Sequence, residues 1–186
     1  TLQMINDKLK CIFVEVPKTG STSVRSVIGN PKRPHKSISQ IKFMVNEKKF
    51  ESYFKFGFVR NPWDRVVSLY KRNEGQKMKD IYSFRDFTKW IKFASSICVL
   101  SLPHRNQLDW FVDCNGEVLV DFIGRFEKIN EDWDIIQEKI GTNIKLPILN
   151  KNENTKHYTE YYDDETKTII YEKFLIDIEF FNYKFE

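Results

Sequence analysis

The chain has 186 residues, of which 41% are hydrophobic, 15% are aromatic and 30% are charged. These values predict a globular chain with a sizeable core, and the 7 glycines and 6 prolines are too few for a low-complexity or disordered one. The net charge of +4 is mild and speaks against a duplex-DNA-binding protein. No apolar run reaches about 18 residues, so we expect no transmembrane span within these residues.

The hydrophobic pattern predicts strands and helices that alternate along the chain. Apolar runs of strand length occupy residues 11–16, 53–59 and 118–126. Helical spacing of apolar residues follows each run, starting near Val24, at Pro62 and at Asn130. Further helices are expected after caps at Ser37, at Ser83 with Asp86, and at Asp163. This alternation predicts an α/β fold in which a largely parallel sheet is flanked by helices.

Turn and cysteine signals complete this outline. Asn115-Gly116 predicts a tight turn, and Gly141 is expected to close the helix that Asn130 opens. Three cysteines are scattered along the chain without a Cys-x-x-Cys pair or a cysteine–histidine cluster. We therefore expect no zinc site and no disulfide framework.

The loop after the first predicted strand has the composition of an anion site. In an open α/β sheet, ligands bind beyond the carboxyl ends of the strands, where a helix N-terminus offers free backbone N–H groups. Gly20 lets the backbone approach an anion closely, and Lys18 adds a positive charge. Hydroxyl donors come from Ser21, Thr22 and Ser23. The alternative is that Ser21 or Thr22 only caps the helix and that Lys18 is solvated.

The segment after the second predicted strand is more specific. Arg60 ends that strand, and Ser68 lies eight residues later on the following helix. Together with Pro17-Lys-Thr-Gly-Ser-Thr-Ser23, this segment resembles the sulfotransferase family, most closely its carbohydrate-type branch with the heparan and chondroitin enzymes and small bacterial relatives. Phe122-Ile-Gly-Arg-Phe-Glu127 and the C-terminal residues 177–183 are also similar, so the resemblance covers nearly the whole chain. It implies a P-loop-like α/β fold and a single sulfotransferase-like domain over residues 1–186.

The resemblance also implies a donor and the residues that bind it. The donor would be 3′-phosphoadenosine 5′-phosphosulfate (PAPS), used without a metal and released as 3′-phosphoadenosine 5′-phosphate (PAP). The first loop would hold the 5′-phosphosulfate, Arg60 and Ser68 would hold the 3′-phosphate, and a C-terminal loop would close over the donor. The residues implied for donor binding are Lys18, Thr19, Gly20, Ser21, Thr22, Ser23, Arg60, Ser68, Lys151 and Lys156. The alternatives are an Arg60–Asp64 ion pair, an ordinary helix hydroxyl at Ser68 and solvated lysines.

Two residues are candidates for the chemical step. Lys18 would neutralise the charge that grows on the leaving oxygen. A base must also take the acceptor proton, and the resemblance favours His35, just ahead of the second predicted helix. Imidazole groups titrate near neutral pH, which suits this role. His104 is the rival base, and the alternative for His35 is a surface loop position. The alternative for His104 is that residues 103–107 form part of an acceptor cleft, with Arg105 and Gln107 as polar contacts.

The resemblance implies a hydroxylated acceptor, most readily a carbohydrate, and the mild charge leads us to expect no nucleic-acid partner. Two other functions stay open. One is a nucleotide-dependent phosphotransferase, which magnesium dependence would distinguish, and the other is a non-catalytic nucleotide- or polyanion-binding domain. Free cysteines and the polar first ten residues favour a cytoplasmic location. The alternative is the Golgi lumen, with a membrane anchor upstream of these residues.

Overall fold

The structure is a computed structural model of the chain, and it describes residues 5–29, 35–74, 87–93, 106–147 and 156–186. The chain divides into two compact units. The first contains Thr1–Arg60 and Gln107–Lys151, and the second contains Asn61–Asn106 and Asn152–Glu186. The single-domain organisation of residues 1–186 stays a prediction.

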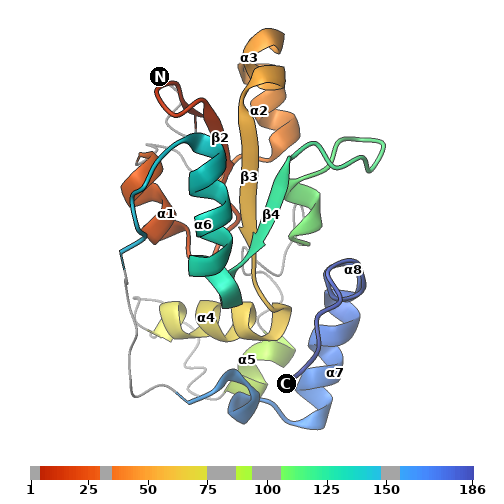
Figure 1. Cartoon of the computed structure of the whole chain (residues 1–186). Coiled ribbons are helices and arrows are strands. Elements are labelled where there is room, and N and C mark those ends of the chain that lie inside the picture. Colours follow the sequence, from red (N-terminus) through yellow and green to blue (C-terminus); the bar gives the residue numbers. More distant parts are fainter. Residues whose placement is uncertain (1–4, 30–34, 75–86, 94–105, 148–155) are drawn as a thin grey trace. The chain divides into compact units, whose positions relative to one another are not determined.

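The first unit contains a four-stranded sheet with the strand order β1-β2-β3-β4, of which β2, β3 and β4 are labelled in Figure 1. Its strands are β1 (Ile5–Asn6), β2 (Cys11–Val14), β3 (Phe54–Val59) and β4 (Phe122–Arg125). β2, β3 and β4 are parallel to one another, and β1 pairs with β2 in the antiparallel direction. The predicted α/β fold with a largely parallel sheet is therefore confirmed.

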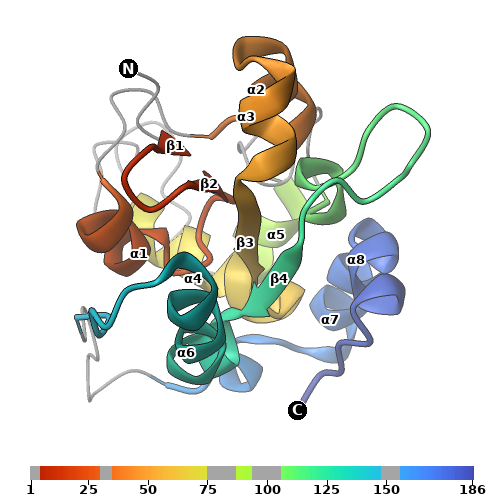
Figure 2. The same ribbon diagram turned by 45° about the horizontal axis from the view of Figure 1, so that its top comes forward.

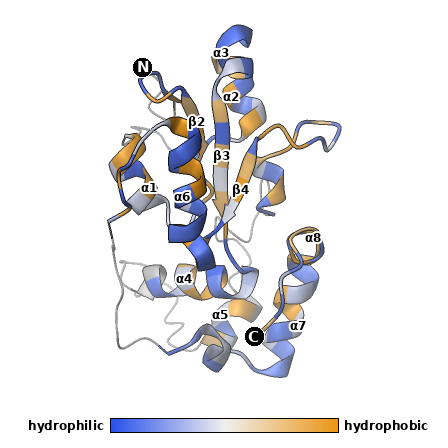
Figure 3. Ribbon diagram, in the orientation of Figure 1, coloured by the Kyte–Doolittle hydropathy of each residue, from blue (hydrophilic) through white to orange (hydrophobic). Residues whose placement is uncertain are grey.

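Two helices, α1 (Ser21–Ile28) and α6 (Ile129–Ile140), lie on the same side of this sheet (Figure 2). Side chains alternate between the faces of a strand, so Phe13 of β2 and Phe56 and Phe58 of β3 share one face. They form one buried cluster with apolar residues of the two helices, which include Val24, Ile28, Trp133, Ile136 and Ile140. α6 is correspondingly apolar on one side and polar on the other (Figure 3).

The remaining elements of the first unit are short. They are the helices α2 (Ile38–Met44) and α3 (Glu47–Ser52) and the 3₁₀ turns η2 (Leu108–Trp110) and η3 (Phe126–Lys128). The cap predicted at Ser37 is confirmed, because its side chain accepts from the Gln40 N–H while the Gln40 side chain accepts from the Ser37 N–H. α3 was not predicted, since Phe50 is its only buried residue and gives no helical period.

The second unit is built from helices. They are α4 (Pro62–Glu74), α5 (Phe87–Phe93), η4 (Tyr158–Tyr161), α7 (Asp164–Lys173) and α8 (Leu175–Phe180). Asn61 joins the start of α4 to the C-terminal residues of the chain. Its side-chain amide donates to the Lys184 carbonyl at 2.8 Å, and its side-chain oxygen accepts from the Trp63 N–H at 3.1 Å. This one buried amide therefore caps the helix and anchors the C-terminal segment.

Several predicted boundaries are wrong. The strand expected from residue 118 begins only at Phe122, because Val118 pairs with Val112 in a small hairpin around the predicted Asn115-Gly116 turn. α6 begins at Ile129 with Lys128 as its N-cap, so Asn130 lies inside the helix, while the end at Gly141 is confirmed. The last helix does start after an Asp163 cap. The Ser83–Asp86 cap lies outside the described residues.

Candidate active site

The first functional segment connects β2 to α1 and lies at the carboxyl end of a parallel strand. Gly20 is the N-cap of α1 with φ of 82°, and within the part of the chain that is described no side chain caps this helix. The prediction that Ser21 or Thr22 serves only as a cap is wrong, because both lie within α1. The Ser23 N–H bonds to the Gly20 carbonyl at 3.2 Å, and the N-terminal end of the helix dipole adds positive potential at this loop.

The side chains that pack around Gly20 leave no room for a larger residue at this position. A Cβ built on this residue would lie 2.8 Å from the Phe126 ring and 2.8 Å from Ile129 Cδ1, which is closer than atoms normally pack. Phe126 and Ile129 come from the segment that follows β4, so this segment packs against the loop. The Gly20 backbone thus lies close against Phe126 and Ile129, and a residue with a Cβ at this position would displace the loop.

We expect Gly20→Ala to destabilise the protein by about 1–2 kcal/mol more than Gly141→Ala. Both glycines have a left-handed backbone, with φ of 82° and 67°, so both alanine variants carry a similar backbone strain. A Cβ on Gly141 would meet no atom within 4 Å, so only Gly20→Ala adds crowding. Thermal and urea unfolding of the two variants measures the difference, and equal losses would contradict this packing.

The hydroxyl groups of the loop have different surroundings. Thr19 is fully buried, and its hydroxyl donates to the Val16 carbonyl at 2.9 Å, so the side chain stabilises the turn and only the backbone of Thr19 can face a ligand. Thr22 is exposed and its hydroxyl accepts from Arg25 Nη2 at 3.4 Å. Ser21 and Ser23 are half-buried on the first turn of α1. The loop thus presents a mixture of N–H and O–H donors.

Arg60 lies against this loop. Its guanidinium donates from Nη1 to the Lys18 carbonyl at 3.3 Å, and its Cζ lies 4.1 Å from the centre of the Phe126 ring. Phe126 therefore supports both Gly20 and Arg60, and the three residues bring the ends of β2, β3 and β4 to one place. The structure brings Arg60 into hydrogen-bond contact with the Lys18 loop, and the donor-binding roles of both stay predictions. The supporting role of Phe126 was not predicted from the sequence.

A buried carboxylate lies directly before the loop. Glu15 is 1% exposed and forms an ion pair with Arg25 of α1 at 3.4 Å. Its second oxygen, Oε2, has no hydrogen-bond partner among the described residues. This pair ties the end of β2 to α1 on either side of the loop, and it was not predicted from the sequence. Because Arg25 also reaches Thr22, the ion pair orders one of the loop hydroxyl groups.

His35 also lies at the end of β2. Its Nδ1 is 3.1 Å from the Glu15 carbonyl oxygen, and its ring packs edge-on against Trp110 with 6.3 Å between ring centres. A carbonyl oxygen can only accept, so Nδ1 carries the proton and donates it to this bond. In the neutral ring, Nε2 then holds the lone pair that a base requires. His35 has φ of 70°, a strained backbone that this contact helps to hold.

The remaining predicted site residues belong to the second unit, lie outside the described residues, or have a different role from the one expected. Ser68 is half-buried on α4, and Lys156 is exposed just before η4, both in the second unit. Lys151 and the rival base His104 lie outside the described residues. Gln107 differs from expectation, because its side chain is fully buried and bonds to the backbone of Arg60 rather than facing an acceptor.

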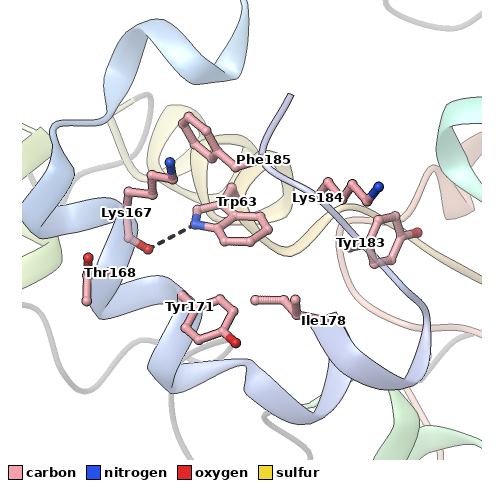
Figure 4. Close-up of a pocket in the computed structure, with 8 residues that line it drawn as sticks. All are labelled: Trp63, Lys167, Thr168, Tyr171, Ile178, Tyr183, Lys184 and Phe185. Atoms are coloured by element: carbon pink, nitrogen blue, oxygen red, sulfur yellow. Dashed lines mark hydrogen bonds between the residues drawn. The ribbon is translucent and has the colours of Figure 1, made fainter.

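The second unit contains a pocket of about 350 Å³ (Figure 4). It is lined by Trp63, Lys167, Thr168, Tyr171, Ile178, Tyr183, Lys184 and Phe185. Trp63 is only 3% exposed, because it stacks on Tyr171 and packs against the edge of Phe185, and its indole N–H donates to the Lys167 carbonyl at 3.1 Å. Of the predicted site residues that the structure describes, none lines this pocket. Its rings serve to pack the C-terminal segment onto α4.

Two further findings concern possible metal ligands and cysteine thiols in the part of the chain that is described. No group of three or more His, Cys, Asp or Glu side chains there could hold a metal ion. Burial raises the pKa of the Cys11 thiol to about 12, so this thiol stays protonated and is a poor nucleophile. Cys114 is exposed. Of the described helices, none combines the length and the apolar character needed to cross a bilayer.

Comparisons with known proteins find relatives of this chain. An uncharacterised protein from Archaeoglobus fulgidus is 36% identical over 110 residues, which cover 58% of this chain and 84% of that protein. Carbohydrate sulfotransferase 11 of Mus musculus and that of Rattus norvegicus are each 26% identical over 80% of this chain and 52% of their own length. The chain thus spans about half the length of these two relatives. No solved structure shows a significant match.

The family model that matches covers almost every residue of the chain. It describes the sulfotransferase family and matches residues 3–184. This range includes the Lys18 loop and Arg60, whose guanidinium bonds to that loop. The chain belongs to the sulfotransferase family.

Proposed function

We propose that this chain transfers a sulfuryl group from PAPS to a hydroxyl group of a carbohydrate acceptor. The contact between Arg60 and the Lys18 loop carries this proposal, because it gathers a helix N-terminus, a lysine and a guanidinium within one unit. PAPS is strongly anionic, and a lysine-containing loop with an adjoining guanidinium supplies positive charge and N–H donors for such a ligand. Family membership and the similarity to carbohydrate sulfotransferase 11 support the reaction and the acceptor class.

In this proposal the loop holds the 5′-phosphosulfate and Arg60 holds the 3′-phosphate. The N–H groups at the start of α1 and the hydroxyls of Ser21, Thr22 and Ser23 donate to the phosphosulfate oxygens. The guanidinium of Arg60 is planar and supported by Phe126, so it can offer two parallel N–H donors to a phosphate. Ser68, Lys151 and Lys156 stay predictions of donor binding that rest on the resemblance alone.

In the chemical step the protein positions the donor and the acceptor, stabilises the negative charge on the leaving oxygen and accepts one proton. The acceptor oxygen forms a bond to sulfur while the bond from sulfur to the bridging oxygen breaks, and PAP leaves. Lys18 stabilises the negative charge that develops on the bridging oxygen. His35 accepts the acceptor proton at Nε2, since its Nδ1–H is held by the Glu15 carbonyl. No step in this scheme requires a metal ion.

We expect His35→Ala to lower kcat for sulfuryl transfer by about 100-fold, because the base is lost while donor binding is kept. The matched control is His157→Ala, since His157 is also exposed and also bonds through Nδ1, to the Thr159 hydroxyl at 2.8 Å. Labelled PAPS with a panel of chondroitin, heparan and simple glycans measures transfer, with and without EDTA. Equal activity of the two variants would remove His35 from the mechanism, and strict magnesium dependence would favour a phosphotransferase.

A further inference from the structure

The side chain of Gln107 is bonded to both backbone groups of one residue. Its Oε1 accepts from the Arg60 N–H at 2.8 Å, and its Nε2 donates to the Arg60 carbonyl at 2.7 Å. Gln107 is 0% exposed, so water cannot replace either bond without opening the structure. The amide thus copies the pair of hydrogen bonds that a neighbouring strand would make.

Arg60 needs such a partner because of where it lies. β3 ends at Val59, which pairs with Arg125 at the end of β4, so Arg60 is the first residue beyond the sheet. A strand end without a partner moves more than the strand itself. The side chain that leaves this backbone must reach the Lys18 carbonyl and the Phe126 ring. A small rotation at the backbone would therefore displace the guanidinium by much more.

We propose that Gln107 is a positioning residue that holds the Arg60 backbone so that its guanidinium faces the Lys18 loop. This inference rests on the proposed function, in which Arg60 distinguishes a ligand with a 3′-phosphate from one without it. Gln107 touches neither donor nor acceptor in this role. The competing explanation is that the amide only fastens η2 to the sheet and contributes to stability alone.

Gln107→Leu and Gln107→Glu test the inference. Leucine removes both bonds, while glutamate keeps the shape and an acceptor but loses the Nε2 donor. Ser39→Ala is the matched control, because the Ser39 hydroxyl donates to the Val112 carbonyl at 2.8 Å and fastens the same segment without touching Arg60. Calorimetry with PAP and with AMP gives the 3′-phosphate preference, and thermal unfolding shows which variants are folded.

We expect both Gln107 variants to lose at least about tenfold in PAP affinity while AMP affinity changes less than about twofold. Ser39→Ala should keep the PAP preference of the wild type. On an Arg60→Ala background, the Gln107 substitutions should have no further effect on PAP binding, because they act through Arg60. Two results would overturn the inference. One is that the Gln107 and Arg60 substitutions lower PAP affinity additively, and the other is that a folded Gln107 variant keeps the wild-type preference for PAP over AMP.

A measurement on the unchanged protein separates the inference from the proposed function. The Arg60 backbone N–H should exchange with solvent as slowly as the amides inside β3, whatever the ligand is. Fast exchange would overturn the positioning role even if PAP binds well. If the amide is protected but the wild type binds PAP no better than AMP, the proposed function fails and its link to Gln107 fails with it.

Discussion

Replacing Lys18 with alanine is expected to lower kcat for sulfuryl transfer by about 100- to 1,000-fold, the largest effect on activity that we predict. Lys18 lies in the loop after β2, where its side chain can reach the bridging oxygen between sulfur and the 5′-phosphate in the proposed mechanism. Its carbonyl, which accepts from Arg60, remains in the variant. PAP affinity should therefore fall much less than kcat, because the charge that Lys18 balances develops only during transfer.

The chain provides a close control for this variant. Lys10 is an exposed lysine in the turn before β2, and it also has a positive φ, 47° against 70° for Lys18. Alanine at either position meets the same kind of backbone strain and removes one positive charge. Lys10→Ala should transfer at the wild-type rate. A Lys18→Ala variant with kcat within about threefold of the wild type would exclude the proposed role of the lysine.

The largest effect on stability is expected for Gly57→Ala, which should destabilise the protein by about 3 kcal/mol or more. Gly57 lies in the middle of β3, on the face opposite Phe56 and Phe58. A Cβ at this position would lie 2.4 Å from Phe111 Cε1 and 2.7 Å from the Val14 carbonyl oxygen. The ring could shift, but the carbonyl belongs to the neighbouring strand and is fixed by the sheet.

Two further variants isolate the cause of this loss. Gly57→Ala combined with Phe111→Leu should recover part of the stability, because it removes one of the two clashing groups. Gly116→Ala should be milder by comparison, since a Cβ there meets no atom within 4 Å. Urea unfolding gives the free energy of unfolding for each. A Gly57→Ala variant as stable as Gly116→Ala would mean that β3 packs differently.

The sequence predicts the order of elements well because that order depends on local signals. Alternating Phe54, Phe56 and Phe58 form a real strand face, and the Ser37 and Asp163 caps are confirmed by their hydrogen bonds. The predicted helix and strand boundaries are wrong where tertiary contacts determine where an element ends. The expected last helix divides at Phe174, which is 1% exposed and joins the core together with Ile170 and Ile178. β1 has two residues, too few to show a period.

The candidate site also contains residues that the sequence identifies and residues that it does not. The loop can be identified from the sequence, since a glycine among small hydroxyl residues between a strand and a helix is a local pattern that is typical of anion sites. The supports of this loop are not predictable, because they come from distant parts of the chain. Gln107 lies 47 positions beyond Arg60, and Phe126 fits beneath Gly20 only after β4 has paired with β3. No local pattern marks either residue.

The central claim is that this chain binds a nucleotide with a 3′-phosphate through Arg60. Calorimetry of PAP and AMP with the wild type and with Arg60→Ala, in the absence of metal, tests it most directly. We expect PAP to bind the wild type at least about tenfold more tightly than AMP, and we expect Arg60→Ala to remove this difference. Equal affinities of the wild type for PAP and AMP would contradict the claim and leave a phosphotransferase or a polyanion-binding domain.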